Sequence, residues 1–282
     1  MLSRKGMEIM RKALRMALTA VVLAAPAWAG ITFTEVTTTE GGRAEGGGNM
    51  TSQMWADGGQ AKVEFRESNN PFLTKGAYML INKKGEMILV NPEKKTYGKF
   101  DLDAMMENVN SAMGAMAKMG FGMEFENPKV EKVLEEPGGT ILGYPTTHYR
   151  WHTTYTMVMH MPRPMKDRRH EADIMEDVWT TTGVSVPTAA TKLFSGASGG
   201  PAMKEVSKLM EVEKAKMTGF PLKRVVVTDE ANGGKRRVTS EVKDLKTVDV
   251  PASTFVVPAG YTEVDMMQPQ RGPGMPDLNK DQ

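Results

Sequence analysis

The segment from Thr147 to Met161 alternates between two kinds of side chain, and this alternation constrains the fold more than any other feature. Its odd positions carry mainly threonine, aromatic residues and methionine, whereas its even positions carry mainly histidine, arginine and threonine. Successive side chains of a strand point to opposite faces, so a period of two predicts a long strand with one apolar face. Pro162 and Pro164 follow, and they predict that the strand ends there.

Shorter segments of the same kind, separated by turn residues, predict that most of the chain forms an antiparallel sheet. Asp57-Gly58-Gly59 predicts a hairpin turn, since Asp-Gly pairs readily adopt the positive φ angles that tight turns need. The expected strands are 31–39, 50–56, 61–66, 77–81, 87–90, 96–100, 129–135, 147–161, 173–180, 222–229, 235–245 and a last extended segment, 255–264.

Two segments predict helices. Apolar residues recur at helical spacing over 101–119, where Asp101 is a good N-cap, and 187–217 is typical of two helical pieces. We therefore expect a mainly β fold of the α+β class, a curved antiparallel sheet or open half-barrel whose concave face is covered by these helices. Two sheets packed as a sandwich are the alternative.

The first 29 residues predict export. Five basic residues accompany an apolar run of about ten residues, and Ala27-Trp28-Ala29 has the form of a signal-peptide cleavage site. The run is too short to cross a bilayer. We expect a cleavable signal peptide over 1–29, cut after Ala29, and a periplasmic protein. A single domain is expected over 30–265 and a disordered tail over 266–282.

Composition excludes several classes of function. The chain has no cysteine, which excludes disulfides, thiol catalysis and cysteine-ligated metals. Five of its 36 basic residues lie in 1–29, so no basic excess remains for binding nucleic acid. Gly196–Gly200 matches the G-x-S-x-G pattern of a class of hydrolases. Those enzymes need a histidine after the serine in the chain, and no histidine follows His170. We expect a non-enzymatic protein with no cofactor; a hydrolase built from carboxylates is the rival.

Methionine is abundant, with 25 residues in the chain. Its flexible, polarizable side chain suits a cavity that adapts to differently shaped apolar ligands, although an ordinary core is the alternative. The residues expected to bind a hydrophobic ligand are Met105, Met106, Val109, Met113, Met116, Tyr149, Trp151, Tyr155, Met157 and Met159.

Metal binding is the other interpretation of these side chains. Met157, Met159 and Met161 share a strand face, and thioethers are suitable ligands for copper(I). The four histidines all lie between His148 and His170, but His148 and His152 would be about 13 Å apart along a strand. We therefore expect no metal site there and interpret the histidines as part of a solvated polar face.

Five motifs in order resemble those of an exported bacterial family known as domain of unknown function 4412, itself similar to periplasmic lipoprotein-carrier and lipoprotein-sorting proteins. The resemblance covers most of residues 50–264. The motifs are Met54-Trp55-Ala56-Asp57-Gly58-Gly59-Gln60-Ala61-Lys62-Val63, Leu142-Gly143-Tyr144-Pro145, Asp177-Val178-Trp179-Thr180, Gly219-Phe220-Pro221-Leu222-Lys223 and Phe255-Val256-Val257-Pro258-Ala259-Gly260-Tyr261.

This resemblance implies an open antiparallel half-barrel with helices against its concave side, a space that holds acyl chains in the carriers. It implies a monomeric periplasmic carrier or envelope chaperone that binds an acyl chain or a lipidated protein and makes transient contact with envelope membranes. The dense methionines of this chain are not a feature we associate with the carriers. Methionine-based copper(I) binding or oxidant buffering is the alternative function.

Overall fold

The computed structural model describes residues 30–41, 48–68, 74–100, 107, 111, 114–187, 189–190, 208–209, 211, 215–229 and 234–265. Residues 1–29 and 266–282, the predicted signal peptide and tail, lie outside the described residues.

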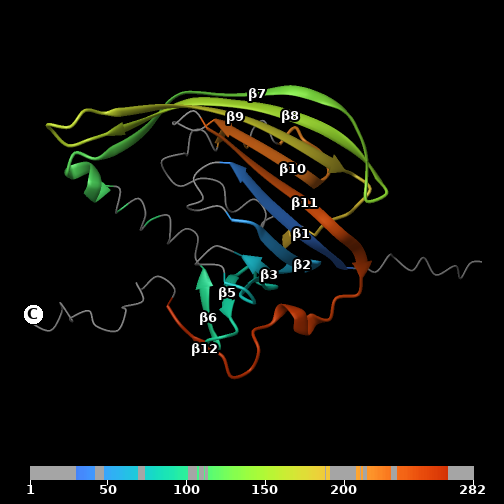
Figure 1. Ribbon diagram of the computed structural model, residues 1–282. Coiled ribbons are helices and arrows are strands. Elements are labelled where there is room, and N and C mark those ends of the chain that lie inside the picture. The colour runs from blue at the N-terminus through green and yellow to red at the C-terminus, as the bar shows by residue number, and fades with distance from the viewer. Residues whose placement is uncertain are drawn as a thin grey trace, which may run out of the picture.

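The described strands form one open, curved sheet (Figure 1). Its order is β12-β6-β5-β4-β3-β2-β1-β11-β10-β9-β8-β7, so the chain runs through neighbouring hairpins on either side of the β1–β11 pair. The expectation of a curved antiparallel sheet is confirmed, and the two-sheet sandwich is wrong. The strands are β1 (Gly30–Gly41), β2 (Met50–Asp57), β3 (Gln60–Ser68), β4 (Tyr78–Ile81), β5 (Met87–Asn91), β6 (Thr96–Phe100), β7 (Gly122–Ile141), β8 (Tyr144–His160), β9 (Arg168–Thr181), β10 (Phe220–Asp229), β11 (Lys235–Val248) and β12 (Thr262–Glu263).

Two predicted strands differ most from the structure. β7 is far longer than 129–135, because it is an edge strand that absorbs its interruptions as register shifts, one of them between Pro137 and Thr140. The segment 255–264 is mostly not a strand. It contains the end of a 3₁₀ helix (Ala252–Phe255) and the two-residue β12, which pairs with β6 in parallel rather than antiparallel orientation.

Two tight turns fix the register of the hairpins. Asp57 pairs with Gln60 across Gly58-Gly59, which confirms the predicted turn, and Gly58 has a φ of 54°. At the β7–β8 turn, Leu142 and Gly143 both have positive φ, 52° and 82°. Two successive positive φ angles match the right-handed twist of the flanking strands. This turn aligns Ile141 with Tyr144 and therefore sets which residues of β8 share a face.

The main core covers the inner, concave face of the sheet, the face to which Phe33, Met54 and Leu222 belong. Phe33 is completely buried and packs edge-to-face on Phe220, with ring centroids 5.4 Å apart. Each such fully buried side chain contributes about 1.5–3 kcal/mol relative to an exposed one. The cluster consists of Ile31, Phe33, Met54, Ala56, Ala61, Ile81, Ala189, Ala190, Phe220, Leu222 and Val242.

A second core lies on the opposite face of β4–β6. Tyr78, Leu80, Ile88 and Val90 form its buried part. Val257 and Tyr261, from the segment after the 3₁₀ helix, pack against it. The C-terminal segment thus covers the outer face at one end of the sheet, and β12 closes that edge through backbone bonds from Thr262 to Lys95 and from Val264 to Tyr97.

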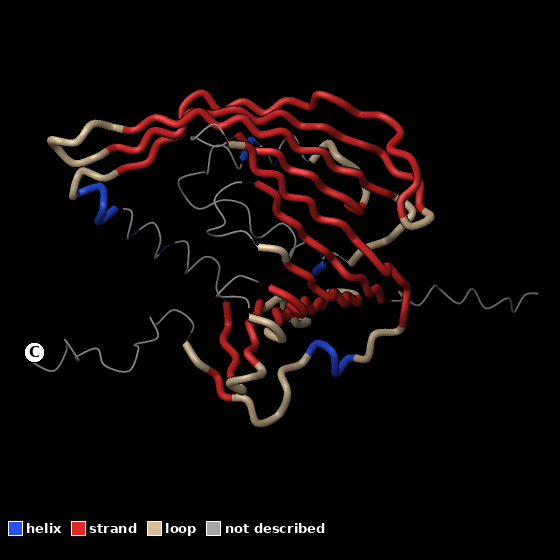
Figure 2. Tube along the Cα trace, viewed as in Figure 1, coloured by secondary structure: helices blue, strands red, loops and turns tan. Residues whose placement is uncertain are grey.

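The two predicted helical segments can be compared with the structure only in part, because most of 101–113 and 188–214 lies outside the described residues. The structure describes few helical residues, and they lie in short pieces (Figure 2). Ala189 and Ala190 are helical and belong to the main core, as a covering element would. Residues 114–118 are helical but exposed, so this piece does not cover the sheet as expected. Among the described residues, no helix is long and apolar enough to cross a membrane.

Three strands extend well past the others. β7, β8 and β9 run on together at the left of Figure 1, and the helical turn before β7 lies beneath their end. We call residues 122–131, 152–160 and 168–175 the arm, because these parts of the three strands pair with one another. Residues 146–151 of β8 and 176–181 of β9 are the root of the arm.

Candidate functional site

The root of the arm places two aromatic side chains on the inner face. Tyr149 and Trp151 are two residues apart on β8, so they point the same way, and both are almost fully buried. Their rings stack with centroids 6.5 Å apart. Val178 lies directly across from Tyr149 on β9 and is also buried. The sequence prediction that these two aromatic residues belong to one apolar face therefore agrees with the structure.

Trp151 carries a buried polar group that lacks a partner. Only 1% of the residue is exposed, and its Nε1–H group has no hydrogen-bond acceptor in the described part of the chain. Buried donors are almost always paired, because leaving one unpaired costs about 1–3 kcal/mol. Such a group needs an explanation, and an acceptor supplied by a ligand is one.

An ion pair between a buried carboxylate and a partly exposed guanidinium group lies beside this tryptophan. Glu176 stands directly across from Trp151 on β9 and is 4% exposed. Arg224, from the next strand, donates from its Nε to Glu176 at 2.6 Å. Register places Arg224 in the same cross-strand row as Tyr149 and Val178. Charges taken out of water are retained only when they are well paired, so this pair brings a fixed polar patch into the apolar face.

Glu35 adds a second carboxyl group to this patch. It lies on β1 and is aligned with Val242 on one side and with Ser52 on the other. Burial raises the pKa of Glu35 to about 7, and the positive charge of Arg224 partly opposes that rise. A carboxyl group with such a pKa gains or loses its proton near neutral pH. We call Trp151, Glu176, Arg224 and Glu35, together with Tyr149, the inner-face site.

Sequence reasoning missed the charged members of this site, although a signal was present. Ile174, Glu176 and Val178 alternate on β9, which places a glutamate in the apolar register. Adjacent Asp177 points to the other face. Adjacent acidic residues such as Glu176-Asp177 are common on solvated strands, yet both of these residues are buried, on opposite sides of the sheet.

Those of the other predicted ligand-binding residues that the structure describes do not belong to this site. Met105, Met106, Val109 and Met113 lie outside the described residues. Met116 is described and is 48% exposed, so it does not line the interior as we expected. Tyr155, Met157 and Met159 are half-buried on the inner face of the arm.

Burial in the arm departs from the simple alternation. Val158, on the outer face, is 2% exposed, whereas its inner-face neighbours Met157 and Met159 are only half-buried. Val158 stands across from Arg169, which forms an ion pair with Glu126 of β7. The apolar stems of long side chains such as these can cover an apolar neighbour on the same face, and here the outer face holds the more deeply buried residue.

His148 corrects the prediction of a solvated histidine face. It is 8% exposed, its ring lies parallel to Trp179 at 4.3 Å, and its Nε2 lies 2.6 Å from Asp177 Oδ1. Arg150 donates from its Nε to the same oxygen at 2.7 Å. The reason is the close approach of β7, where a Cβ on Gly138 would come within 2.7 Å of the Trp179 ring. His148 Nδ1 faces Glu136 at 3.4 Å, so carboxylates meet both ring nitrogens and the arrangement is that of a structural clamp.

Two of the remaining histidines, His152 and His160, have carboxylate partners of their own. His152 Nε2 lies 3.1 Å from Asp173, and His160 Nδ1 lies 2.8 Å from Asp167. The hydrogen bonds with Asp167 and Glu124 raise the pKa of His160. Within the described ranges, no group of three or more histidine, aspartate or glutamate side chains is placed to hold a metal ion.

Comparison with known proteins identifies the family. The profile of a family designated Domain of unknown function (DUF4412) matches residues 35–261. The chain belongs to this family. The family recognised from five sequence motifs is thereby confirmed.

Two solved structures are similar to this member of the DUF4412 family. One is a LolA superfamily protein from Nitrosomonas europaea, with 10% identity, a TM-score of 0.29, and coverage of 81% of this chain and 90% of that one. The other is PNGF-II, with 16% identity, a TM-score of 0.30, and coverage of 84% of this chain but 31% of that one. The chain thus spans about a third of the length of PNGF-II. No curated protein matches the chain.

Proposed function

We propose that this protein binds a hydrophobic ligand, an acyl chain or a lipidated protein segment, on the inner face of its sheet. It would act in the periplasm as a non-enzymatic carrier or envelope chaperone. The observation that carries the proposal is the buried Trp151, whose Nε1–H lacks an acceptor within an aromatic and apolar surface. An ester or amide carbonyl at the head of an acyl chain would supply that acceptor, while the chain itself lies along the apolar side chains.

The ion pair beside Trp151 supports a ligand with a polar head. A purely aliphatic ligand would leave the Arg224–Glu176 pair and the Glu35 carboxyl group facing hydrocarbon, which is costly. A ligand with a polar head and an apolar tail can match both parts of the face. Each methylene that moves from water into the apolar part contributes about 0.8 kcal/mol, so long chains would remain bound through purification.

The test uses palmitate and a tripalmitoylated peptide as probes, with binding followed by native mass spectrometry and titration. Trp151→Phe keeps most of the ring but removes the donor, and we expect about five- to tenfold weaker binding from the loss of one hydrogen bond. Trp179→Phe is the matched control, because that tryptophan lies on the outer face against His148. Failure of both probes to bind, or equal losses in the two variants, would contradict the proposal.

We also propose that the protein is not an enzyme. The carboxylate hydrolase that the sequence left open would now be sought at Glu35 and Glu176, since a raised carboxyl pKa is typical of general acids. A screen with esterase, phosphatase and glycosidase substrates tests this alternative. We expect no turnover. Activity that disappears in Glu35→Gln would show that the inner-face site is an active site.

Copper(I) binding stays as the second candidate, and one observation favours it. Met123 of β7 stands directly across from Met159, which brings a further thioether to the face that carries Met157 and Met161. Soft sulfur ligands of this kind select copper(I). Uptake of one copper(I) ion per chain, lost when Met123 and Met159 are both replaced by leucine, would establish this function instead.

A further inference from the structure

The free end of the arm combines exposed methionines with cations that form no ion pair with a described residue. Gly120, with a φ of 86°, ends the helical turn and lies so close to Pro162 that a Cβ would come within 3.2 Å of the proline Cα. The turn before β7 and the loop between β8 and β9 therefore meet at one place. We call this the tip patch; its residues are Lys118, Met119, Met123, Arg163, Met165, Lys166 and Arg168.

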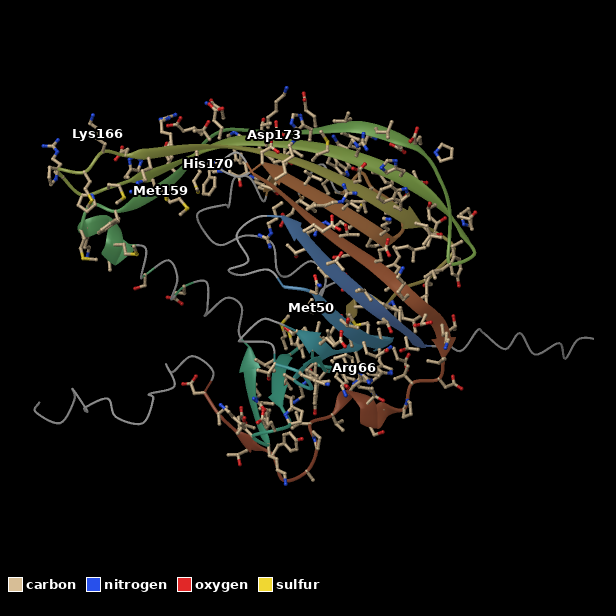
Figure 3. All side chains as sticks on the ribbon, viewed as in Figure 1. Met50, Arg66, Met159, Lys166, His170 and Asp173 are labelled. Atoms are coloured by element: carbon tan, nitrogen blue, oxygen red, sulfur yellow. The ribbon has the colours of Figure 1, made fainter. Side chains whose placement is uncertain are left out.

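The apolar members of the tip patch face solvent. Met119 is 61% exposed, Met165 52% and Met123 42%. Figure 3 shows Met159 and Lys166 at this end of the arm, far from the strands around Met50 and Arg66. Large apolar side chains that gather at a projecting end of a protein mark an interaction surface more often than scattered ones do.

The charges at the tip are asymmetric. Asp167 and Glu124 both bond to His160, and Glu126 pairs with Arg169, so the acidic groups nearby already have partners. In contrast, Lys118, Arg163, Lys166 and Arg168 form no ion pair with any described residue, and all four are exposed. The chain after residue 29 carries 31 basic and 33 acidic residues, so this local positive excess is not a property of the whole molecule.

We propose that the tip patch docks on the surface of a membrane that contains anionic phospholipids. The methionines would enter the boundary between headgroups and acyl chains, while the four cations would contact the phosphates. Binding of this kind depends on buried apolar area together with electrostatic attraction. The same four cations repel a copper(I) ion, which makes metal binding the weaker interpretation of these methionines.

The tip patch is separate from the inner-face site, because the two share no residue. The two can therefore fail independently. Trp151→Phe should leave membrane binding unchanged, and changes in the tip patch should leave the affinity for palmitate unchanged.

The experiment uses the chain from Gly30 onward, which contains every residue that the structure describes. Binding to vesicles of phosphatidylglycerol and phosphatidylcholine in equal parts is compared with binding to phosphatidylcholine alone by sedimentation, at low and high salt. We expect binding to the anionic vesicles only, weakened by salt. Replacing both Arg163 and Lys166 by glutamine should weaken binding about 25-fold, since each basic residue near an anionic surface contributes about fivefold.

Matched variants distinguish an effect of the tip patch from a general effect of changing charge or apolar surface. Lys83→Gln/Lys84→Gln removes two exposed lysines from the turn before β5 and should leave binding unchanged. Met119→Gln should weaken binding several-fold, whereas Val133→Thr, at another exposed apolar residue of the β7–β9 sheet, should not. Absence of vesicle binding, equal losses in both lysine-containing pairs, or stoichiometric copper(I) uptake without vesicle binding would overturn the proposal.

Discussion

The root and the arm of β8 are parts of one strand, yet they differ in how they are covered. In the root, Trp151 is buried on the inner face and His148 on the outer face, so both sides are shielded. In the arm, Tyr155 and Met157 are half-exposed on the inner face, and His152 and His160 form their ion pairs in contact with solvent. Alternation sets which residues share a face, whereas burial depends on what lies against that face.

The same difference governs the charged pairs. The His148–Asp177 pair of the root is buried, with side-chain exposures of 10% and 12%. The His152–Asp173 pair is more open, at 30% and 56%, although it has the same chemistry on the same two strands. Water competes little with the first pair and strongly with the second, so the root should be the stable part of the strand and the arm the part free to make new contacts.

The largest effect should come from truncating the aromatic residue of the root. Trp151→Ala should lower the free energy of unfolding by about 3–5 kcal/mol, as expected for a buried large aromatic side chain. Tyr155→Ala, four residues further along the same face, should cost only about 1 kcal/mol, mainly from its edge-to-face contact with Phe125. Urea unfolding of both variants measures the difference, and equal losses would show that the arm is as well packed as the root.

The two histidine–aspartate pairs offer a sharper comparison. Asp177→Asn should destabilise the protein by about 2–3 kcal/mol, because the carboxylate accepts hydrogen bonds from His148 and Arg150 in a buried place. Asp173→Asn should cost less than about 0.5 kcal/mol, as is usual for an exposed ion pair. Thermal or urea unfolding tests this pair of values. A large loss for Asp173→Asn would contradict the view that solvent weakens the arm.

Much of the sheet could be predicted from sequence because it depends on local signals. The period of two in β8, the Gly58-Gly59 turn and the proline-rich end after His160 each act over a few residues. Deep burial of His148 and Glu176 could not be predicted in this way. It depends on β7 crossing close to Trp179 and on Arg224 arriving from a distant part of the chain, and neither neighbour is visible in a local pattern. The aromatic half of the site was therefore found, and its charged half was missed.

The buried carboxyl group of the inner-face site should respond to pH in the opposite sense to the carboxylates of the arm. Burial raises the pKa of Glu35 from 4.5 to about 7. At a pH between these two values, the folded state therefore holds a proton that the unfolded state has lost. Stability should therefore fall as pH rises from about 4.5 through 7, by about 2 kcal/mol after allowing for partial solvent contact. In Glu35→Gln this fall should disappear, while Glu40→Gln, an exposed site on the same strand, should retain it.

The smallest effect should come from the exposed His160–Asp167 pair of the arm. Hydrogen bonds with Asp167 and Glu124 raise the pKa of His160, and the bond to His160 lowers the pKa of Asp167. The histidine therefore contributes stability below its ordinary pKa of 6.5 and loses that contribution as pH rises through the raised value. The aspartate contributes stability above its ordinary pKa of 3.8 and loses that contribution as pH falls through the lowered value.

NMR titration should show a raised His160 pKa in the wild type and a partial return toward 6.5 in Asp167→Asn, with Glu124 still in place. Identical titrations in the two proteins would mean that solvent already separates this pair, and that the arm is looser than its hydrogen bonds indicate.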